Sequence, residues 1–320
     1  MSEGVDCAKN IDDDRIEAVD DLAQHYKSGF VAVMGRPNVG KSTLVNALLG
    51  TKIAAVSPWP QTTRKRQMGI LTLEQAQIIF VDTPGVHQPL HKLGERMNKE
   101  ALEVLEECDY ALLVVDGSQA PGEEDQMLVE ILIKLKRSIP ILMVLNKIDL
   151  ANDITLLANQ AAYQALLPRA NTLMISATQE DNLEEIVFKL VSGLPEGPPF
   201  FPEDQLTDLY EREIVADLIR EAVLYHLRAE VPHSIAVRID DYKERDQNNL
   251  YIAATLFVER ESQKGIVIGQ GGIMLKKIGT AARQKIEAMI GSKVFLSLRI
   301  KVRKNWRNDE AALRLFGFGA

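Results

Sequence analysis

Short apolar runs alternate with amphipathic stretches over the first two thirds of the chain. The apolar runs predict β-strands at residues 30–34, 77–82, 110–116, 140–147 and 172–177. Between them, apolar positions at helical spacing predict helices, for example at residues 41–49 and 123–136. Continuous apolar strands separated by amphipathic helices are typical of a doubly wound, mostly parallel sheet with helices on both faces. In such an α/β domain, ligands bind at the carboxyl ends of the strands.

The pattern changes at residues 194–204, where four prolines disfavour both helix and strand and indicate a stiff linker. Beyond this segment, the pattern predicts a helix near residues 208–228, two alternating strands, a glycine-rich turn, a helix near residues 273–290 and a last strand. This order predicts a small α+β domain. The predicted parts are an acidic extension (1–28), an α/β domain (29–193), a linker (194–207) and an α+β domain (208–320).

Composition narrows the class of protein. The chain is 46% hydrophobic and 26% charged, and its longest apolar runs are far shorter than the ~20 residues that a membrane-spanning helix needs. The first residues are acidic and lack the apolar segment of a signal peptide. Two cysteines, Cys7 and Cys108, cannot form a disulfide framework and have no metal-ligand spacing. We therefore expect a cytoplasmic protein.

Charge is unevenly distributed along the chain. The net charge is −8, yet residues 260–307 contain twelve Lys/Arg and only two acidic residues, a local balance of +10. A global acidic balance argues against nucleic acid, whereas a concentrated basic block favours it locally. The block includes the glycine-rich turn, so we interpret it as a nucleic-acid site rather than as a solvated surface.

A phosphate-binding loop is predicted at GRPNVGKS, which satisfies G-x-x-x-x-G-K-[ST] between a predicted strand and helix. Its backbone N–H groups would face the phosphates, Lys41 would reach the β- and γ-phosphates, and Ser42 would coordinate Mg²⁺. The predicted nucleotide-contacting residues are Gly35, Arg36, Pro37, Asn38, Val39, Gly40, Lys41, Ser42 and Thr43.

The motif NKID indicates that the base is guanine. The Asp149 carboxylate can accept hydrogen bonds from guanine N1–H and the 2-amino group, whereas adenine would leave it unpaired, which gives strong discrimination. Asn146 and the stem of Lys147 would frame the base. The segment SAT (Ser176, Ala177 and Thr178) would offer a backbone N–H to guanine O6.

Two further motifs complete a GTP-dependent switch. In DTPG (Asp82, Thr83, Pro84 and Gly85), Asp82 would hold Mg²⁺ through water and the Gly85 N–H would sense the γ-phosphate. In QTTR, either Thr62 or Thr63 would close on Mg²⁺ when the γ-phosphate is present. The order and spacing of these elements predict a GTPase with GTP or GDP and Mg²⁺ as its cofactors.

Slow intrinsic hydrolysis is expected, because Val86 follows Gly85 at the position where Ras-like GTPases carry a glutamine that orients water. Asn38 resembles an asparagine with which one class of GTPases holds K⁺ beside the phosphates. It could equally serve only to shape the loop, and the sequence leaves both roles open.

The glycine-rich turn GQGG fits neither a second nucleotide loop nor a dinucleotide fingerprint, because Ile273 stands where Lys-Ser/Thr would follow and the glycine spacing differs. It matches the G-x-x-G loop of a KH domain, which clamps about four single-stranded nucleotides. Ile266, Ile268 and Ile273 would line a groove for bases. The remaining predicted RNA contacts are Gly269, Gln270, Gly271, Gly272, Lys276 and Lys277.

These motifs together resemble the Era family of bacterial GTPases, from about residue 29 to the C-terminus. The resemblance is carried by GRPNVGKSTLVNALLG, PQTTR, DTPGVH, NKID, FFPEDQLTD and VIGQGG. It implies a P-loop GTPase domain followed by a type II KH domain, binding to the 3′ end of 16S rRNA, action in 30S subunit assembly, peripheral contact with the cell membrane, and a monomer. Two departures are Gln270, where the family usually has lysine, and the acidic extension.

Two other classes of protein share some of these motifs. A GTP-dependent RNA-modification or tandem-GTPase factor is disfavoured by the single set of GTPase motifs and the lack of modification chemistry. In the other, the chain is a structural RNA-binding protein and nucleotide only stabilises it; GTP turnover distinguishes this alternative from a GTPase.

Overall fold

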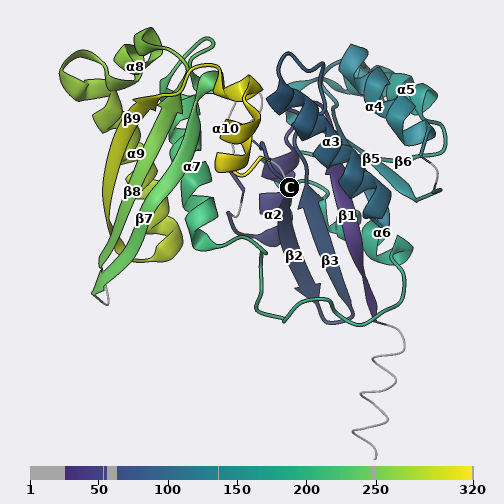
Figure 1. Cartoon of the computed structure of the whole chain (residues 1–320). Helices are drawn as coiled ribbons and strands as arrows, with labels where there is room; N and C mark the ends of the chain where they lie inside the picture. The colour runs from purple at the N-terminus through teal and green to yellow at the C-terminus, as the bar shows by residue number, and fades with distance from the viewer. Residues whose placement is uncertain (1–25, 53, 56–62, 136, 247–248, 319–320) are drawn as a thin grey trace, which may run out of the picture.

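The computed structural model describes residues 26–52, 54–55, 63–135, 137–246 and 249–318. Most of the acidic extension lies outside these ranges, as do Gln61 and Thr62 of the QTTR loop. Figure 1 shows two α/β lobes side by side, with the last helix, α10 (Glu310–Leu315), between them. No helix in the described ranges has the length and apolar character needed to cross a membrane.

The first domain contains a six-stranded sheet with the order β2-β3-β1-β4-β5-β6. Its strands are β1 (Lys27–Met34), β2 (Gln67–Leu73), β3 (Ala76–Asp82), β4 (Tyr110–Asp116), β5 (Ile141–Asn146) and β6 (Asn171–Met174). All neighbours pair in parallel except β2, which is antiparallel to β3. The predicted mostly parallel, doubly wound sheet is confirmed, and β2 is an edge strand that the sequence pattern did not reveal.

Helices cover both faces of this sheet, as the apolar strands predicted. They are α2 (Lys41–Leu49), α3 (Lys92–Glu107), α4 (Glu123–Ile133), α5 (Asp153–Leu166) and α6 (Leu183–Gly193). Along β1, Val31 and Val33 pack with α2 and α6, while Ala32 and Met34 pack with α3 and α4 on the other face. Because the central strands bury both of their faces, their middle positions are apolar.

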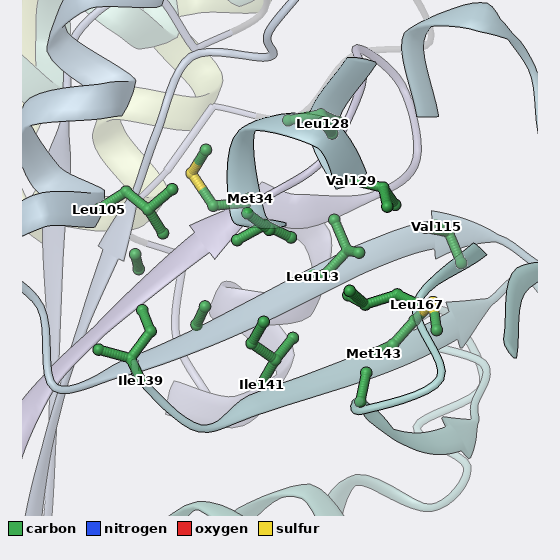
Figure 2. Close-up of a cluster of buried hydrophobic side chains, with 14 of the residues drawn as sticks. Met34, Leu105, Leu113, Val115, Leu128, Val129, Ile139, Ile141, Met143 and Leu167 are labelled. Carbon is green, nitrogen blue, oxygen red and sulfur yellow. The ribbon is translucent and has the colours of Figure 1, made fainter. Parts of the chain in front are cut away.

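Figure 2 shows the core on the α3–α4 face. Met34 at the end of β1 and Leu113 on β4 lie beneath Leu128 of α4, and Leu105 of α3 points to the same space. All four side chains are at most 1% exposed. This packing fixes the carboxyl ends of β1 and β4, from which the nucleotide loops begin.

The second domain contains a three-stranded sheet, β7 (Ala236–Asp246), β8 (Asn249–Val258) and β9 (Lys293–Val302). The β7 strand is antiparallel to β8, and β9 is parallel to it. Helices α7 (Glu211–His226) and α9 (Ile273–Ile290) pack on one face. A further helix, α8 (Glu261–Ile268), precedes the glycine-rich turn, where the sequence pattern had indicated only an apolar stretch.

The proline-rich segment is bound to the first domain along its length. Gln77 of β3 accepts from the N–H groups of Phe200 and Phe201 at 2.8 and 3.0 Å, and its side-chain amide donates to the Phe201 carbonyl at 2.8 Å. Further along, the Ile70 N–H of β2 donates to the Leu206 carbonyl at 2.9 Å. The predicted linker thus lies between α6 and α7 and is bound to the first domain.

The two domains also contact each other directly. Leu93 and Met97 of α3 share an apolar cluster with Phe257 of β8 and with Trp306, which is fully buried. Lys52 forms an ion pair of 2.9 Å with Glu221 of α7. Apolar and polar side chains of both domains therefore meet across this interface, in addition to the core that each domain contains.

Candidate nucleotide and RNA sites

The P-loop connects the end of β1 to the start of α2. Lys41 begins α2, is only 7% exposed, and donates from Nζ to the carbonyls of Gly35 and Arg36 at 3.1 and 3.2 Å. Gly40 has φ 100°, and a Cβ there would lie 2.3 Å from the side-chain nitrogen of Asn146. The loop therefore curls around the lysine, and only glycine fits where it meets the NKID segment.

Burial changes the chemistry of Lys41. It lowers the pKa of the ammonium to about 8, although the negative charges of Asp82 and Glu124 partly offset this effect. An ammonium ion taken out of water is destabilised unless an anion is brought next to it. The phosphates of a nucleotide would supply that anion, so this lysine is suited to binding a polyanion.

Three oxygen-bearing side chains converge beside Lys41. The Ser42 hydroxyl donates to Asp82 Oδ2 at 2.6 Å and lies 2.8 Å from the Thr63 hydroxyl. Thr63 also donates to Asp82 Oδ2, at 3.1 Å. Of the two threonines considered from the sequence, Thr63 is thus placed with the other predicted Mg²⁺ ligands, and Thr62 lies outside the described residues.

The cluster has the properties of a cation site. Asp82 is 1% exposed, and its second oxygen, Oδ1, is buried without a hydrogen-bond partner among the described residues. Burial raises the pKa of Asp82, against the lowering effects of Lys41 and the two hydroxyls. Hydroxyl and carboxylate oxygens are ligands that Mg²⁺ prefers. The residues present therefore fit Mg²⁺, with Ser42, Thr63 and Asp82 able to hold it.

The DTPG segment lies against the P-loop. A Cβ on Gly85 would lie 2.8 Å from the backbone nitrogen of Pro37, so the two segments touch through their main chains. The next side chain, Val86, is 2% exposed and packs in the apolar core that contains Met34. No polar group is therefore presented at that position, which agrees with the expectation from sequence.

The guanine-binding residues lie beyond the carboxyl end of β5. Asn146 joins two loops, because its amide donates to the Val39 carbonyl at 2.8 Å and its oxygen accepts from the Ala177 N–H at 2.9 Å. That N–H is therefore already engaged, so the structure does not offer it to guanine O6. The Ser176 hydroxyl donates to Asp149 Oδ1 at 2.6 Å and lies 3.2 Å from the Thr178 hydroxyl, which orients the carboxylate.

The predicted KH loop connects α8 to α9. Gly269, Gly271 and Gly272 all have positive φ, at 71°, 59° and 81°. A Cβ on Gly269 would lie 2.7 Å from the Cβ of Met274, whereas Gly271 and Gly272 face open space. Gly269 is thus needed for packing, and the other two expose their backbone to a ligand.

A groove of about 390 Å³ lies between α9 and β9, next to this loop. It is lined by Gly272, Leu275, Lys276, Gly279, Thr280, Arg283, Val294, Phe295, Leu296 and Leu298. Ile266, Ile268 and Ile273 do not line this groove, and Ile266 and Ile273 are more than half exposed beside the turn, so their contact with bases stays a prediction. Lys276 lines the groove, whereas Lys277 does not.

Comparison with known proteins decides the family. Residues 30–147 match the model of the 50S ribosome-binding GTPase family, and residues 230–307 match the KH domain. The GTPase Era of Carboxydothermus hydrogenoformans is 48% identical over 92% of this chain and 98% of its own length. The chain belongs to the Era family of GTPases. Era of Geobacter metallireducens is 46% identical over the same shares of the two chains.

Two solved Era structures are similar to this chain over its two domains. One is Era in complex with MgGDPNP and nucleotides 1506–1542 of 16S ribosomal RNA, with a TM-score of 0.88 and 40% identity over 92% of this chain and 100% of that one. The other is an Aquifex aeolicus Era variant bound to GDP·AlF₄⁻, with a TM-score of 0.87, 40% identity and the same coverage. The Era fold, a P-loop GTPase domain followed by a KH domain, is therefore confirmed.

One functional contact of this Era-family site was missed from the sequence. Asp116, the last residue of β4, accepts from Lys147 Nζ at 2.8 Å and from the Ser118 hydroxyl at 2.6 Å. Burial alone would raise the pKa of Asp116, but these hydrogen bonds outweigh it and lower the pKa. The position of Asp116 at the end of a buried, apolar strand could have indicated this contact from the sequence. Asp116 fixes the Lys147 stem that would lie along the base.

Two other predicted residues have structural contacts in this Era-family domain. The Arg36 guanidinium donates to the Gln119 side chain at 3.2 Å and forms an ion pair of 3.4 Å with Asp125, so these partners hold it. The Thr83 hydroxyl is buried and donates to the Val33 carbonyl at 2.9 Å, which ties DTPG to β1. Both residues shape the loops around the nucleotide site.

Proposed function

We propose that this chain binds and hydrolyses GTP and that its KH domain binds the 3′ end of 16S rRNA during assembly of the 30S ribosomal subunit. The single observation that carries the GTPase part is the cluster of Ser42, Thr63 and Asp82 beside the buried Lys41. Membership of the Era family supports the same function. An Era structure in complex with 16S rRNA nucleotides supports the RNA part.

The residues divide the work of the GTPase site. Lys41 neutralises charge on the phosphates, and Ser42, Thr63 and Asp82 hold Mg²⁺, which stabilises developing negative charge on the phosphate oxygens. Because Thr63 lies in a loop while Ser42 lies in the first turn of α2, Thr63 is the member of the set that can respond to the γ-phosphate. Asp149 selects guanine. Turnover is slow unaided, since Val86 cannot orient water.

The groove beside the GQGG turn supports an RNA-binding role. Gly271 and Gly272 have no neighbouring atoms that would block a sugar-phosphate chain. The groove combines apolar side chains with Lys276 and Arg283, as single-stranded RNA requires for its bases and its phosphates. Gln270 would contribute hydrogen bonds but no charge, so phosphate binding depends more on the lysine and the arginine.

One variant tests the RNA function separately from the GTPase function. Gly271→Asp adds a negative charge where a phosphate would lie, so we expect it to weaken binding at least tenfold in fluorescence anisotropy with a single-stranded RNA from the 3′ end of 16S rRNA. A milder loss and a salt slope shallower by about 0.7 are expected for Lys276→Ala. GTP affinity should stay unchanged in both. If Gly271→Asp binds this RNA as tightly as the wild type, the turn is not an RNA site.

The location and assembly state belong to the same proposal. We expect a cytoplasmic monomer that copurifies with 30S particles and makes peripheral contact with the inner face of the cell membrane, as the resemblance to Era implies. Sedimentation of purified protein, cosedimentation with 30S particles and flotation with liposomes of bacterial lipids test these three statements independently.

A further inference from the structure

An exposed aromatic pair lies at one end of the second sheet. Tyr251 of β8 and Phe295 of β9 are cross-strand partners whose rings stack, with centroids 5.8 Å apart and an interplanar angle of 17°. The Arg245 guanidinium lies 4.6 Å from the Tyr251 ring and 5.8 Å from the Phe295 ring. The Arg245 guanidinium is as far from the Phe295 ring as the two ring centroids are from each other, so Arg245 lies beside the pair and not between the rings.

Phe295 also belongs to the groove between α9 and β9. At one end of the groove lie the GQGG turn and Lys276; at the other lie Arg283 and Phe295, because α9 runs antiparallel to β9. Gly279, in the middle of α9, sits opposite Leu298, which agrees with this direction. Leu296 and Leu298 pack on the face of the sheet that α9 covers, so the Phe295 ring lies on the other face, at the sheet edge beside this end of the groove. A strand of RNA that leaves the turn, follows the groove and crosses the edge of β9 therefore reaches Phe295.

Phe295 lies beside an open sheet edge, because no strand of the described residues pairs with β9 on the side away from β8. β9 is the edge strand of the sheet, and Phe295 is 63% exposed although it is a large apolar side chain. A ring that served only to stabilise the sheet would gain by being covered. The exposed ring is instead positioned to accept another flat group on its free side.

The charges around this ring favour a polyanion. None of the residues that line the groove is acidic, while Lys276 and Arg283 line it. Lys293 and Arg299, on either side of Phe295 along β9, are exposed and form no ion pair within the described part of the chain. A flat, negatively charged chain such as single-stranded RNA is the occupant that matches both the ring and the charges.

We propose that Phe295, backed by Tyr251 and Arg245, is a base-stacking subsite that extends the KH groove and holds a nucleotide beyond those gripped at the GQGG turn. The inference rests on the proposed RNA-binding function and deepens it. Stacking on an aromatic face is tolerant of base identity, so this subsite adds affinity and sets the length of RNA bound, while it contributes little to sequence choice.

The test is a double-mutant cycle between protein and RNA. A single-stranded RNA from the 3′ end of 16S rRNA is prepared with an abasic site at each position in turn, which removes one base and keeps every phosphate. In the wild type, one position distant from the nucleotides held by the turn should lose about tenfold in affinity when abasic. In Phe295→Leu, the same change should cost less than twofold, because the ring that stacks is gone.

Matched variants separate stacking from folding. Phe295→Tyr keeps the ring and should retain the abasic effect, and Tyr225→Ala removes an exposed aromatic residue of α7 outside the groove and should leave it unchanged. Equal melting temperatures for all variants confirm folding. If no abasic position is coupled to Phe295 while Gly271→Asp still abolishes binding, the subsite is refuted and the RNA function stands. If the wild type binds none of the RNAs, both fail.

Discussion

Arg64 joins the GTPase switch to the KH domain, and its removal is the most informative perturbation of the interface. It follows Thr63 of the Mg²⁺ cluster directly, yet its side chain is 4% exposed in the neighbouring domain. It donates to the carbonyls of His233 and Ile235 at 2.7 and 2.8 Å. Two consecutive residues, Thr63 and Arg64, therefore contact the Mg²⁺ cluster and the segment just before β7.

The structure bounds the size of the effect. Two hydrogen bonds from a charged donor contribute about 1.5–3 kcal/mol each. Burial, with the neighbouring charges of Arg220 and Arg307, lowers the pKa of Arg64 well below its ordinary value, so burying the charge offsets part of this gain. We expect Arg64→Met, which keeps the length and loses both donors, to weaken docking by about 2–4 kcal/mol. This corresponds to about a 30- to 800-fold shift towards undocked domains.

Small-angle X-ray scattering and calorimetry measure this shift. Arg64→Met should give a larger radius of gyration than the wild type and should split one thermal transition into two, because undocked domains unfold independently. Arg66→Met makes the same chemical change on an exposed side chain two residues away and should behave as the wild type. If Arg64→Met scatters and melts like Arg66→Met, Arg64 does not hold the domains together and the reasoning is wrong.

Three further predictions concern the nucleotide site. Asp149→Asn should lower GTP affinity at least 100-fold and improve XTP affinity, measured by calorimetry, since xanthine carries a 2-oxo group in place of the amino group; unchanged GTP affinity would exclude the assignment. The pKa of Lys41 is lowered to about 8, and bound phosphate should raise it again, so GTP binding should take up about half a proton at pH 8. GTP affinity should therefore fall as the pH rises from 7 to 9. An equal proton uptake at pH 6.5 and pH 8 would contradict this. Turnover should be faster in KCl than in NaCl at equal ionic strength, and Asn38→Ala should remove the difference; equal rates in the two salts would exclude K⁺ at Asn38.

The nucleotide site could be predicted because its motifs are short and contiguous. GRPNVGKS, DTPG and NKID each lie within a single strand–loop unit, so the local pattern specified both residue type and position. The contact between Asp116 and Lys147 could not be predicted, because it depends on the pairing of β4 with β5, which sets Asp116 opposite Asn146.

The KH groove and the domain interface depend on tertiary contacts of the same kind. The sequence pattern predicted that RNA bases lie beside the isoleucines around the turn. The packing of α9 against β9 instead places the groove beside Leu275 and Phe295. α8 was missed because Gly265 lowers its helix propensity. The prolines after Leu194 predict a linker from local composition alone, but no local pattern reveals that Arg64 is buried in the other domain.

Crosslinking of the protein to RNA in growing cells, followed by sequencing of the attached RNA, shows directly whether the KH domain binds the 3′ end of 16S rRNA. We expect the attached RNA to be concentrated at the 3′ end of 16S rRNA and the crosslinked peptides to come from residues 230–307. The Gly271→Asp variant should lose this signal while it still binds GTP. Crosslinks concentrated in another RNA, or peptides that come mainly from residues 30–147, would contradict this expectation.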